Sequence, residues 1–206
     1  MRGEERWGGM RARSVYCALA VSDTVLAAAG LHRPRWATKP LLMPLLFVDA
    51  DRRSQRALAL SWAGDVALMG NGKAAFTAGL GSFLGAQVAW IDTLRSRPGS
   101  GLLRRRPVVA VPYLVTLVGL NAYLWRRSGS DRIPVLVYSV VLTAMALTAA
   151  DSGDPATAAG GALFFTSDAL IALDRFGDVH LPGHDGWVMG TYTAAQALLA
   201  GSPSDQ

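Results

Sequence analysis

Long apolar runs separated by short polar clusters dominate this chain. A membrane-spanning helix needs about 20 predominantly apolar residues, and most of the runs approach that length. The pattern predicts eight helices, or seven if the weak second segment, which contains Pro40 and Pro44, is not counted. The predicted helices cover residues 14–31, 36–48, 57–70, 74–91, 107–125, 133–150, 156–174 and 186–200.

The pattern predicts a single all-α membrane domain, a helical bundle over residues 14–201. A basic cytoplasmic leader, residues 1–13, is expected before it, and a short tail, residues 202–206, after it. The first apolar run has the basic start and small-residue end of a signal peptide. Asp23 inside that run and the seven later runs favour a first transmembrane helix instead.

Composition supports a polytopic membrane protein. The 206 residues are 51% hydrophobic and only 17% charged, whereas soluble domains carry about 25% charged residues. The net charge of +5 does not indicate nucleic-acid binding, because the arginines cluster at the ends of apolar runs, next to anionic lipid headgroups. Twelve of the 20 lysines and arginines fall on the side of the N-terminus. This bias predicts a cell-membrane protein with both termini in the cytoplasm.

Two aspartates interrupt apolar segments in which charge is costly. Asp65 lies within residues 57–70 and Asp168 within residues 160–176. A carboxylate at the centre of a membrane helix costs about 2.5–3.5 kcal/mol on insertion scales, so it is a functional candidate. The predicted topology places both acids about two thirds of the way along parallel helices. They are therefore expected at a similar depth, in the outer half of the bilayer.

The acids alone leave three interpretations open. Two carboxyl groups that share a cavity can divide the roles of acid and base in catalysis. Membrane carboxylates are equally typical of proton or ion transport. Each aspartate can also serve packing only, through bonds to the backbone or to Ser61, Thr166 or Ser167.

Other polar side chains are candidates for the same cavity. From the expected outer side come Lys39, Asp174 and Arg175, and within apolar runs lie Tyr138, Tyr192, Gln87 and Gln196. No metal or cofactor is predicted. Cys17 is the single cysteine, and Pro182 and Gly183 separate His180 from His184 in what is expected to be a solvated loop.

Short matches between the two halves suggest an internal repeat. Residues 64–68 (GDVAL) resemble residues 167–171 (SDALI), and an Ala-Gln pair follows each, at Gln87 and at Gln196. These matches predict a parallel 4+4 repeat. Such matches also arise by chance in alanine-rich apolar sequence, so the repeat is one interpretation of them.

Four sequence blocks follow one another in order from about residue 36. They are residues 37–44 (ATKPLLMP), 61–69 (SWAGDVALM), 76–83 (FTAGLGSF) and 161–168 (GALFFTSD), the last followed by Arg175-Phe176. Together with Tyr192 and Gln196 in the final helix, they resemble the lysoplasmalogenase family, also called YhhN-like membrane proteins. The sequence departs from that family at Gln87, where many members have a histidine, so any proton transfer by that histidine is missing here.

The resemblance implies an eight-helix hydrolase that cleaves the vinyl-ether bond of lysoplasmalogens. Its products would be a fatty aldehyde and a glycerophospho-ethanolamine or -choline. Asp65 and Asp168 would share the acid and carboxylate roles, as in the oxocarbenium-like chemistry of glycosidases. Lys39 and Arg175 would meet the lipid phosphate. The alternatives are a proton-coupled transporter or carrier using the same acids, and a hydrolase of a different lipid.

Overall fold

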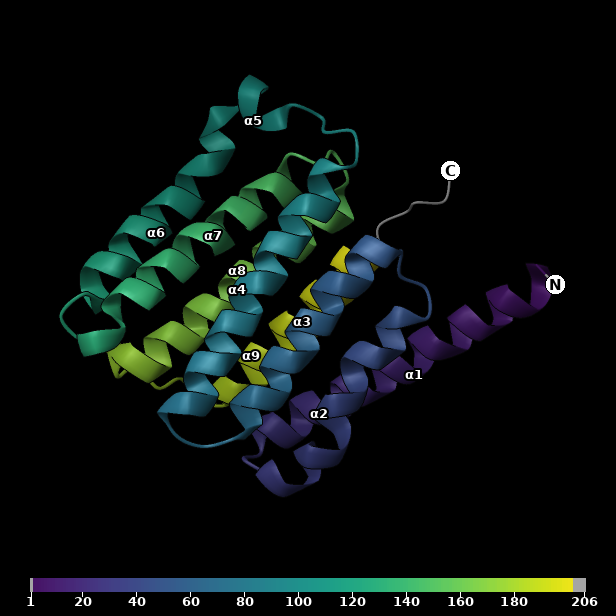
Figure 1. The fold of residues 1–206 in the computed structure, drawn as a ribbon, viewed down its shortest axis with the longest axis horizontal. Helices are drawn as coiled ribbons and strands as arrows, with labels where there is room; N and C mark the ends of the chain where they lie inside the picture. The colour runs from purple at the N-terminus through teal and green to yellow at the C-terminus, as the bar shows by residue number, and fades with distance from the viewer. Residues whose placement is uncertain (1, 202–206) are drawn as a thin grey trace.

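The computed structural model describes residues 2–201, and this part of the chain is helical with no β-strand (Figure 1). The elements in chain order are α1 (Arg2–Ala28), α2 (His32–Phe47), α3 (Arg52–Met69), α4 (Lys73–Arg95), α5 (Leu102–Arg105), the 3-10 turn η1 (Pro107–Ala110), α6 (Val111–Leu124), the 3-10 turn η2 (Gly129–Asp131), α7 (Arg132–Ala150), α8 (Pro155–Gly177) and α9 (His184–Ala200).

Every predicted segment is helical, but several boundaries differ from the prediction. Helix α1 begins at Arg2, so the backbone of the predicted leader is continuous with the first helix. Helix α3 begins at Arg52, earlier than predicted, because the Asp51 side chain caps it by accepting hydrogen bonds from two backbone N–H groups. Hydrophobicity alone misses that polar first turn. The single-turn helix α5 was not predicted. Residues 202–206 lie outside the described residues.

Four of the helices are long and apolar enough to cross a membrane, counted over the described residues. They are α4, η1 with α6, η2 with α7, and α8. The first turns of α2 and α3 are rich in arginine, which lowers their hydropathy. The protein is therefore an all-helical protein with four candidate membrane-spanning helices.

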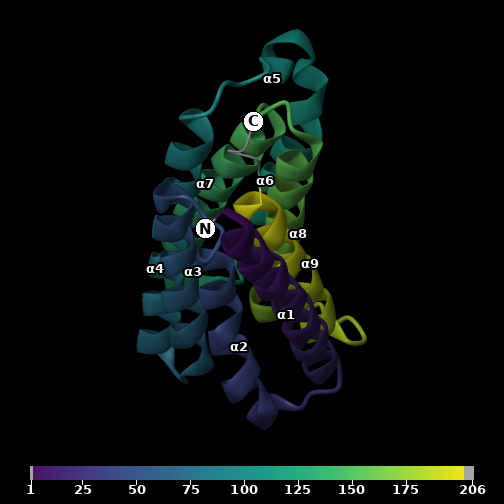
Figure 2. The same cartoon turned by 90° about the vertical axis from the view of Figure 1, so that its right-hand side faces the viewer.

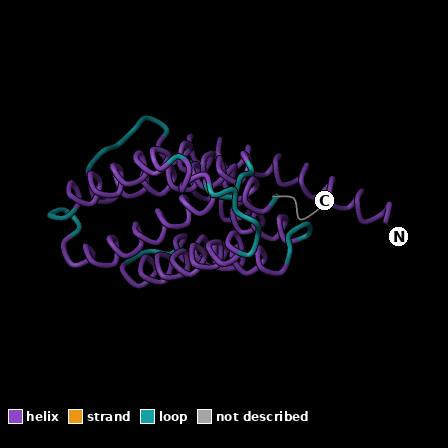
Figure 3. The backbone as a smooth tube through the Cα atoms, turned by 90° about the horizontal axis from the view of Figure 1, so that it is seen from above, coloured by secondary structure: helices purple, strands orange, loops and turns teal. Residues whose placement is uncertain are grey.

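The long helices lie side by side in one bundle, with α1 and α6 at opposite flanks (Figure 1). Helix α3 packs along α4, and α8 packs along α9, while α7 contacts both α4 and α8. Viewed from the side, α1 crosses the bundle next to α2 and α9 (Figure 2). Its N-terminal end projects beyond the other helices (Figure 3). The centre is filled by Trp90, Phe164 and Met145, each fully buried.

Glycines allow the helix pairs to approach closely. A Cβ on Gly64 of α3 would lie 2.6 Å from the ring of Phe83 on α4. A Cβ on Gly161 of α8 would lie 2.5 Å from the Cβ of Ala149 on α7. Real atoms do not come so close, so any larger residue would force these helices apart. Small residues at helix contacts are typical of membrane bundles, where apolar side chains gain little by leaving lipid.

Helix α2 continues through Pro40 and Pro44 because a neighbour compensates for a missing hydrogen bond. Proline has no N–H, so Pro44 leaves the carbonyl of Pro40 without its helical donor. The indole Nε1–H of Trp62 on α3 donates to this carbonyl at 2.9 Å. The weak second segment of the sequence is thus a full helix, supported by a tryptophan from the following helix.

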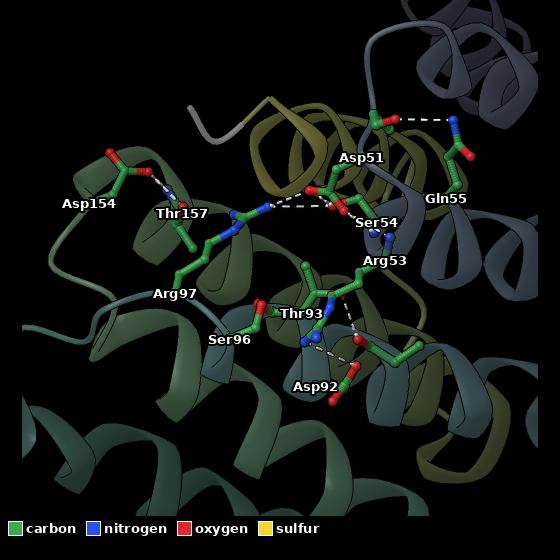
Figure 4. A network of polar contacts seen from close by, with 12 residues as sticks. Asp51, Arg53, Ser54, Gln55, Asp92, Thr93, Ser96, Arg97, Asp154 and Thr157 are labelled. Atoms are coloured by element: carbon green, nitrogen blue, oxygen red, sulfur yellow. Dashed lines mark hydrogen bonds and ion pairs between the residues drawn. The ribbon is translucent and has the colours of Figure 1, made fainter. Parts of the chain in front are cut away.

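A polar network joins the start of α3 to the end of α4 (Figure 4). Arg97 approaches Asp51 at 3.2 Å, and Arg53 approaches Asp92 at 3.7 Å. Burial alone would raise the pKa of Asp51, but the hydrogen bonds from Ser54, Arg53 and Arg97 outweigh it and lower this pKa. This end of the bundle is therefore closed by charged contacts. Asp65 and Asp168 lie towards the other end.

Candidate active site

A cavity of about 110 Å³ lies between six helices, near the end of the bundle where α3 and α8 terminate. Two acids, Asp65 and Asp168, line it. The other charged or tyrosine side chains in its wall are Lys39, Tyr138, Arg175 and Tyr192. The rest of its wall is almost entirely apolar. Those other lining residues are Leu68, Phe76, Leu80, Phe83, Val135, Ser167, Ile171, Ala172, Phe176, Val188 and Met189.

Asp65 is a carboxylate with both oxygens occupied. Its side chain comes from α3 and is almost completely buried. The hydroxyl of Tyr192 on α9 donates to Oδ2 at 2.7 Å, and the ammonium of Lys39 on α2 lies 3.1 Å from Oδ1. A buried charge needs a partner of opposite sign and further hydrogen bonds, and Asp65 has both. The environment therefore fits an ionised Asp65.

Asp168 has a different set of partners. It comes from α8, and the hydroxyl of Tyr138 on α7 donates to its Oδ2. Within the described residues no lysine, arginine or histidine forms an ion pair with Asp168, and Oδ1 has no hydrogen bond. Asp65 is near enough for the two acids to interact electrostatically. A second negative charge beside Asp65, without a cation, is unfavourable, so the environment fits a protonated Asp168.

Gln87 and Gln196 are fully buried behind the two tyrosines, outside the cavity wall. The amide of Gln87 lies near the hydroxyl of Tyr138, and the amide of Gln196 lies near that of Tyr192. Neither amide forms a hydrogen bond of good geometry in the described part of the chain. In space, each acid thus contacts a tyrosine that has a glutamine behind it. Asp168 has Tyr138 and then Gln87, and Asp65 has Tyr192 and then Gln196.

Arg175 and Asp174 are neighbours in sequence but differ in position. The guanidinium of Arg175 lies 3.7 Å from the centre of the Phe76 ring and forms part of the cavity wall. Asp174, near the end of α8, does not line the cavity. Its carboxylate lies 2.7 Å from Nδ1 of His180, in the loop that follows the helix. Eight of the nine site residues predicted from the sequence therefore lie at the cavity, and Asp174 is the exception. Six of the eight line its wall, namely Lys39, Asp65, Tyr138, Asp168, Arg175 and Tyr192, and the two glutamines lie behind its tyrosines.

The hydroxyl groups expected to bond the acids in a purely structural role have other partners. Ser167 donates to the carbonyl of Val188, and Thr166 donates to that of Ala162. Ser61 forms no hydrogen bond within the described residues. The acids are held by a lysine and two tyrosines instead.

Sequence reasoning missed the aromatic wall of the cavity. Phe76, Leu80 and Phe83 follow one face of α4 at helical spacing, and this periodicity is the signal that could have found them. The ring of Phe83 lies 5.9 Å from that of Tyr192, and Phe164 lies 5.5 Å from Tyr192. These edge-to-face contacts close the inner end of the cavity.

A metal site is a separate question. Among the described residues, no three histidine, cysteine, aspartate or glutamate side chains come together in a group that could hold an ion. The chemistry that the cavity offers from its own side chains is proton transfer and the stabilisation of positive charge.

Comparison with known proteins gives one finding. The family model described as the YhhN family matches residues 34–203, most of the chain. No curated protein and no solved structure significantly matches this chain.

Proposed function

Because this chain belongs to the YhhN family, we propose that it is a membrane-embedded hydrolase that cleaves the vinyl-ether bond of lysoplasmalogens. Its products are a fatty aldehyde and a glycerophospho-headgroup. The observation that carries this proposal is the unequal pairing of the two acids in one apolar cavity: among the side chains that the structure describes, Asp65 has a cationic partner and Asp168 has none. Vinyl-ether hydrolysis needs a proton donor and a negative charge, and this pair supplies both.

In the proposed first step, Asp168 donates its proton to the vinyl carbon remote from the ether oxygen. Tyr138 donates to Oδ2, so Oδ1 is the oxygen that carries the proton in this proposal, and Asp168 itself lines the cavity. The double bond is consumed and the carbon attached to oxygen becomes an oxocarbenium ion. The ionised carboxylate of Asp65 stabilises that positive charge, while Lys39 and Tyr192 keep it in place.

In the second step, water attacks the oxocarbenium carbon and gives its proton to the Asp168 carboxylate. The product is a hemiacetal. Its collapse breaks the bond between that carbon and the glycerol oxygen: the hemiacetal hydroxyl loses a proton and the glycerol oxygen gains one. The fatty aldehyde and the glycerol alcohol leave, and Asp168 is again protonated. No proton transfer here requires a histidine at position 87.

We also propose that all eight long helices cross the cell membrane, with both termini in the cytoplasm and the cavity towards the outer leaflet. The bias in arginine and lysine supports this orientation. It can be tested by replacing Cys17 with serine and placing single cysteines at Ser100, between α4 and α5, and at Ser130 in the 3-10 turn η2, at opposite ends of the bundle. A membrane-impermeant maleimide added to intact cells should label the Ser130 position only, and the reverse labelling would contradict this topology.

The proposed activity is tested by release of aldehyde from a 1-alkenyl lysophospholipid by the purified protein in detergent. A hydrolase works without a sealed membrane, so aldehyde should accumulate in micelles. The matched saturated 1-alkyl lipid, which has no vinyl ether, should release none. If no aldehyde forms in detergent while the protein moves protons across sealed vesicles, the hydrolase is wrong and the transporter interpretation of the same acids replaces it.

A further inference from the structure

A second cavity, of about 450 Å³, adjoins the first at the same end of the bundle. Its wall comes from the first turns of α2 and from the link between α3 and α4. Those residues are His32, Arg35, Trp36, Lys39, Leu68, Met69, Gly70 and Asn71. Lys39 and Leu68 belong to both cavities. The two spaces are therefore adjacent, with the lysine at their boundary.

The second cavity differs from the first in charge. Two arginine or lysine side chains and one histidine line it, and no acid is among the lining residues. Arg35 is fixed from behind by Asp23, a fully buried acid on α1: Nε and Nη2 lie 3.4 Å from its carboxylate, and Thr38 donates to it at 2.6 Å. Nη1 of Arg35 has no hydrogen bond within the described residues. A buried acid thus orients a guanidinium whose remaining donors are free for a ligand.

The charges around this cavity limit the kind of anion that it can hold. Asp23 already balances Arg35, and Asp65 already balances Lys39. The site therefore offers directed donors and little excess positive charge, with the imidazole of His32 as a further lining group that can form a hydrogen bond. Such a site suits a singly charged phosphodiester better than a doubly charged phosphate.

We infer that the second cavity binds the phosphodiester headgroup of the lipid, while the vinyl ether and its chain occupy the first. This inference rests on the proposed function, and deepens it by dividing the substrate between two adjacent spaces. Lys39, at the boundary, contacts the phosphodiester on one side and Asp65 on the other. Trp36, which is 59% exposed at the rim, lies where an aromatic ring favours the membrane interface.

The test uses a lipid that binds without being cleaved. The intact protein in detergent is titrated with 1-O-alkyl-glycero-3-phosphocholine, which has a saturated ether and a phosphodiester. The comparison ligands are the matching 1-O-alkylglycerol, which lacks phosphate, and inorganic phosphate alone. We expect the phosphodiester lipid to bind about tenfold more tightly than the alkylglycerol, as one to two charge-assisted hydrogen bonds would give.

Three variants assign that preference to the cavity. His32→Gln removes a lining group without disturbing an ion pair. The double change Asp23→Asn with Arg35→Gln removes the guanidinium and avoids leaving a buried acid unpaired. Both should reduce the preference for the phosphodiester severalfold. Lys73→Gln is the control, because Lys73 is exposed at the same end of the bundle and lines neither cavity, so it should keep the preference.

Each outcome decides the inference. An unchanged preference in both cavity variants would overturn it, and so would inorganic phosphate binding as tightly as the lipid, which would indicate a site for free phosphate. The expected preference without any cleavage of vinyl ethers would reject the proposed activity and keep the headgroup site. Aldehyde release with no preference for the phosphodiester would keep the proposed activity and reject the headgroup site.

Discussion

The two acids of the first cavity, Asp65 and Asp168, occupy matching places in the chain but have unlike surroundings. Each is held by a side chain from the preceding long helix: Lys39 of α2 for Asp65, and Tyr138 of α7 for Asp168. When the Ala-Gln pairs of α4 and α9 are aligned, Phe83 falls at the position of Tyr192. Asp65 thus has a cation and a tyrosine, whereas Asp168 has a tyrosine and, within the described residues, no ion-pair partner. The same scaffold thus gives one acid an environment that fits the ionised form and the other an environment that fits the protonated form.

The largest expected effect comes from removing the proton donor. Asp168→Asn should reduce aldehyde release by about 10²–10⁴-fold, which is the range of general acid catalysis. The asparagine still accepts the hydrogen bond from Tyr138, so the fold should persist. Asp174→Asn is the matched control, since that acid lies outside the cavity and pairs with His180. Full activity in Asp168→Asn would remove the distinction between the two acids.

Asp65→Asn should act on stability as well as on activity, because it leaves the largely buried Lys39, whose side chain is 15% exposed, without its counter-ion. Breaking one member of a buried ion pair costs about 3–5 kcal/mol in the free energy of unfolding. Unfolding by detergent titration, followed by circular dichroism, measures this loss. The double variant Asp65→Asn with Lys39→Met removes both charges and should recover most of the stability while remaining inactive. Recovered activity in the double variant would contradict the role of Asp65.

The two tyrosines provide a smaller and sharper comparison. Tyr138→Phe removes the one hydrogen bond that Asp168 receives within the described residues, and should lower kcat by about tenfold. Tyr192→Phe leaves Asp65 its lysine and should lower kcat less. The measurement is kcat for both variants in the same detergent. Equal losses of kcat would mean that each acid depends on its tyrosine to the same extent. The ion pair with Lys39 would then make no functional difference between Asp65 and Asp168.

The smallest expected effect lies at the other end of the bundle, where Asp51 is 36% exposed. Its pKa is lowered in the folded protein, so its contribution to stability is complete above the unfolded pKa of about 3.9 and is lost as pH falls through the folded value. Asp51→Asn keeps a capping side chain but loses the ion pair with Arg97. It should cost less than about 1 kcal/mol at pH 7, and in thermal unfolding the difference from wild type should shrink as pH falls through the lowered pKa of Asp51. A large loss in the free energy of unfolding would mean that the end of the bundle around Asp51 governs stability.

The sequence was sufficient for the features that stand out against an apolar background. The helices follow from the apolar runs, and Asp65 and Asp168 are conspicuous because charge is rare there. That both acids line one cavity agrees with the similar depth expected of them from parallel helices. The family match over residues 34–203 confirms the resemblance drawn from the sequence blocks.

The partners of the acids could not be predicted, because they depend on how each helix is rotated and packed. Lys39 has the sequence context of an interfacial anchor, yet it reaches an acid on the next helix. Trp62 belongs to a recognised block, but its bond to the Pro40 carbonyl follows only from the way α2 packs on α3. Asp174 is as polar as Arg175 beside it, and its side chain points to His180 instead of the cavity. The 4+4 repeat and the number of membrane crossings remain predictions.

The hydrogen bond between Tyr192 and Asp65 joins residues 127 positions apart. During synthesis, Lys39 and Asp65 are made well before α9 exists. Until that helix has docked, the ion pair has no hydroxyl donor from Tyr192 and the cavity lacks one side, so a partly made chain has no complete site. Under the proposed activity, aldehyde release would therefore report that the late helix has docked against the early ones.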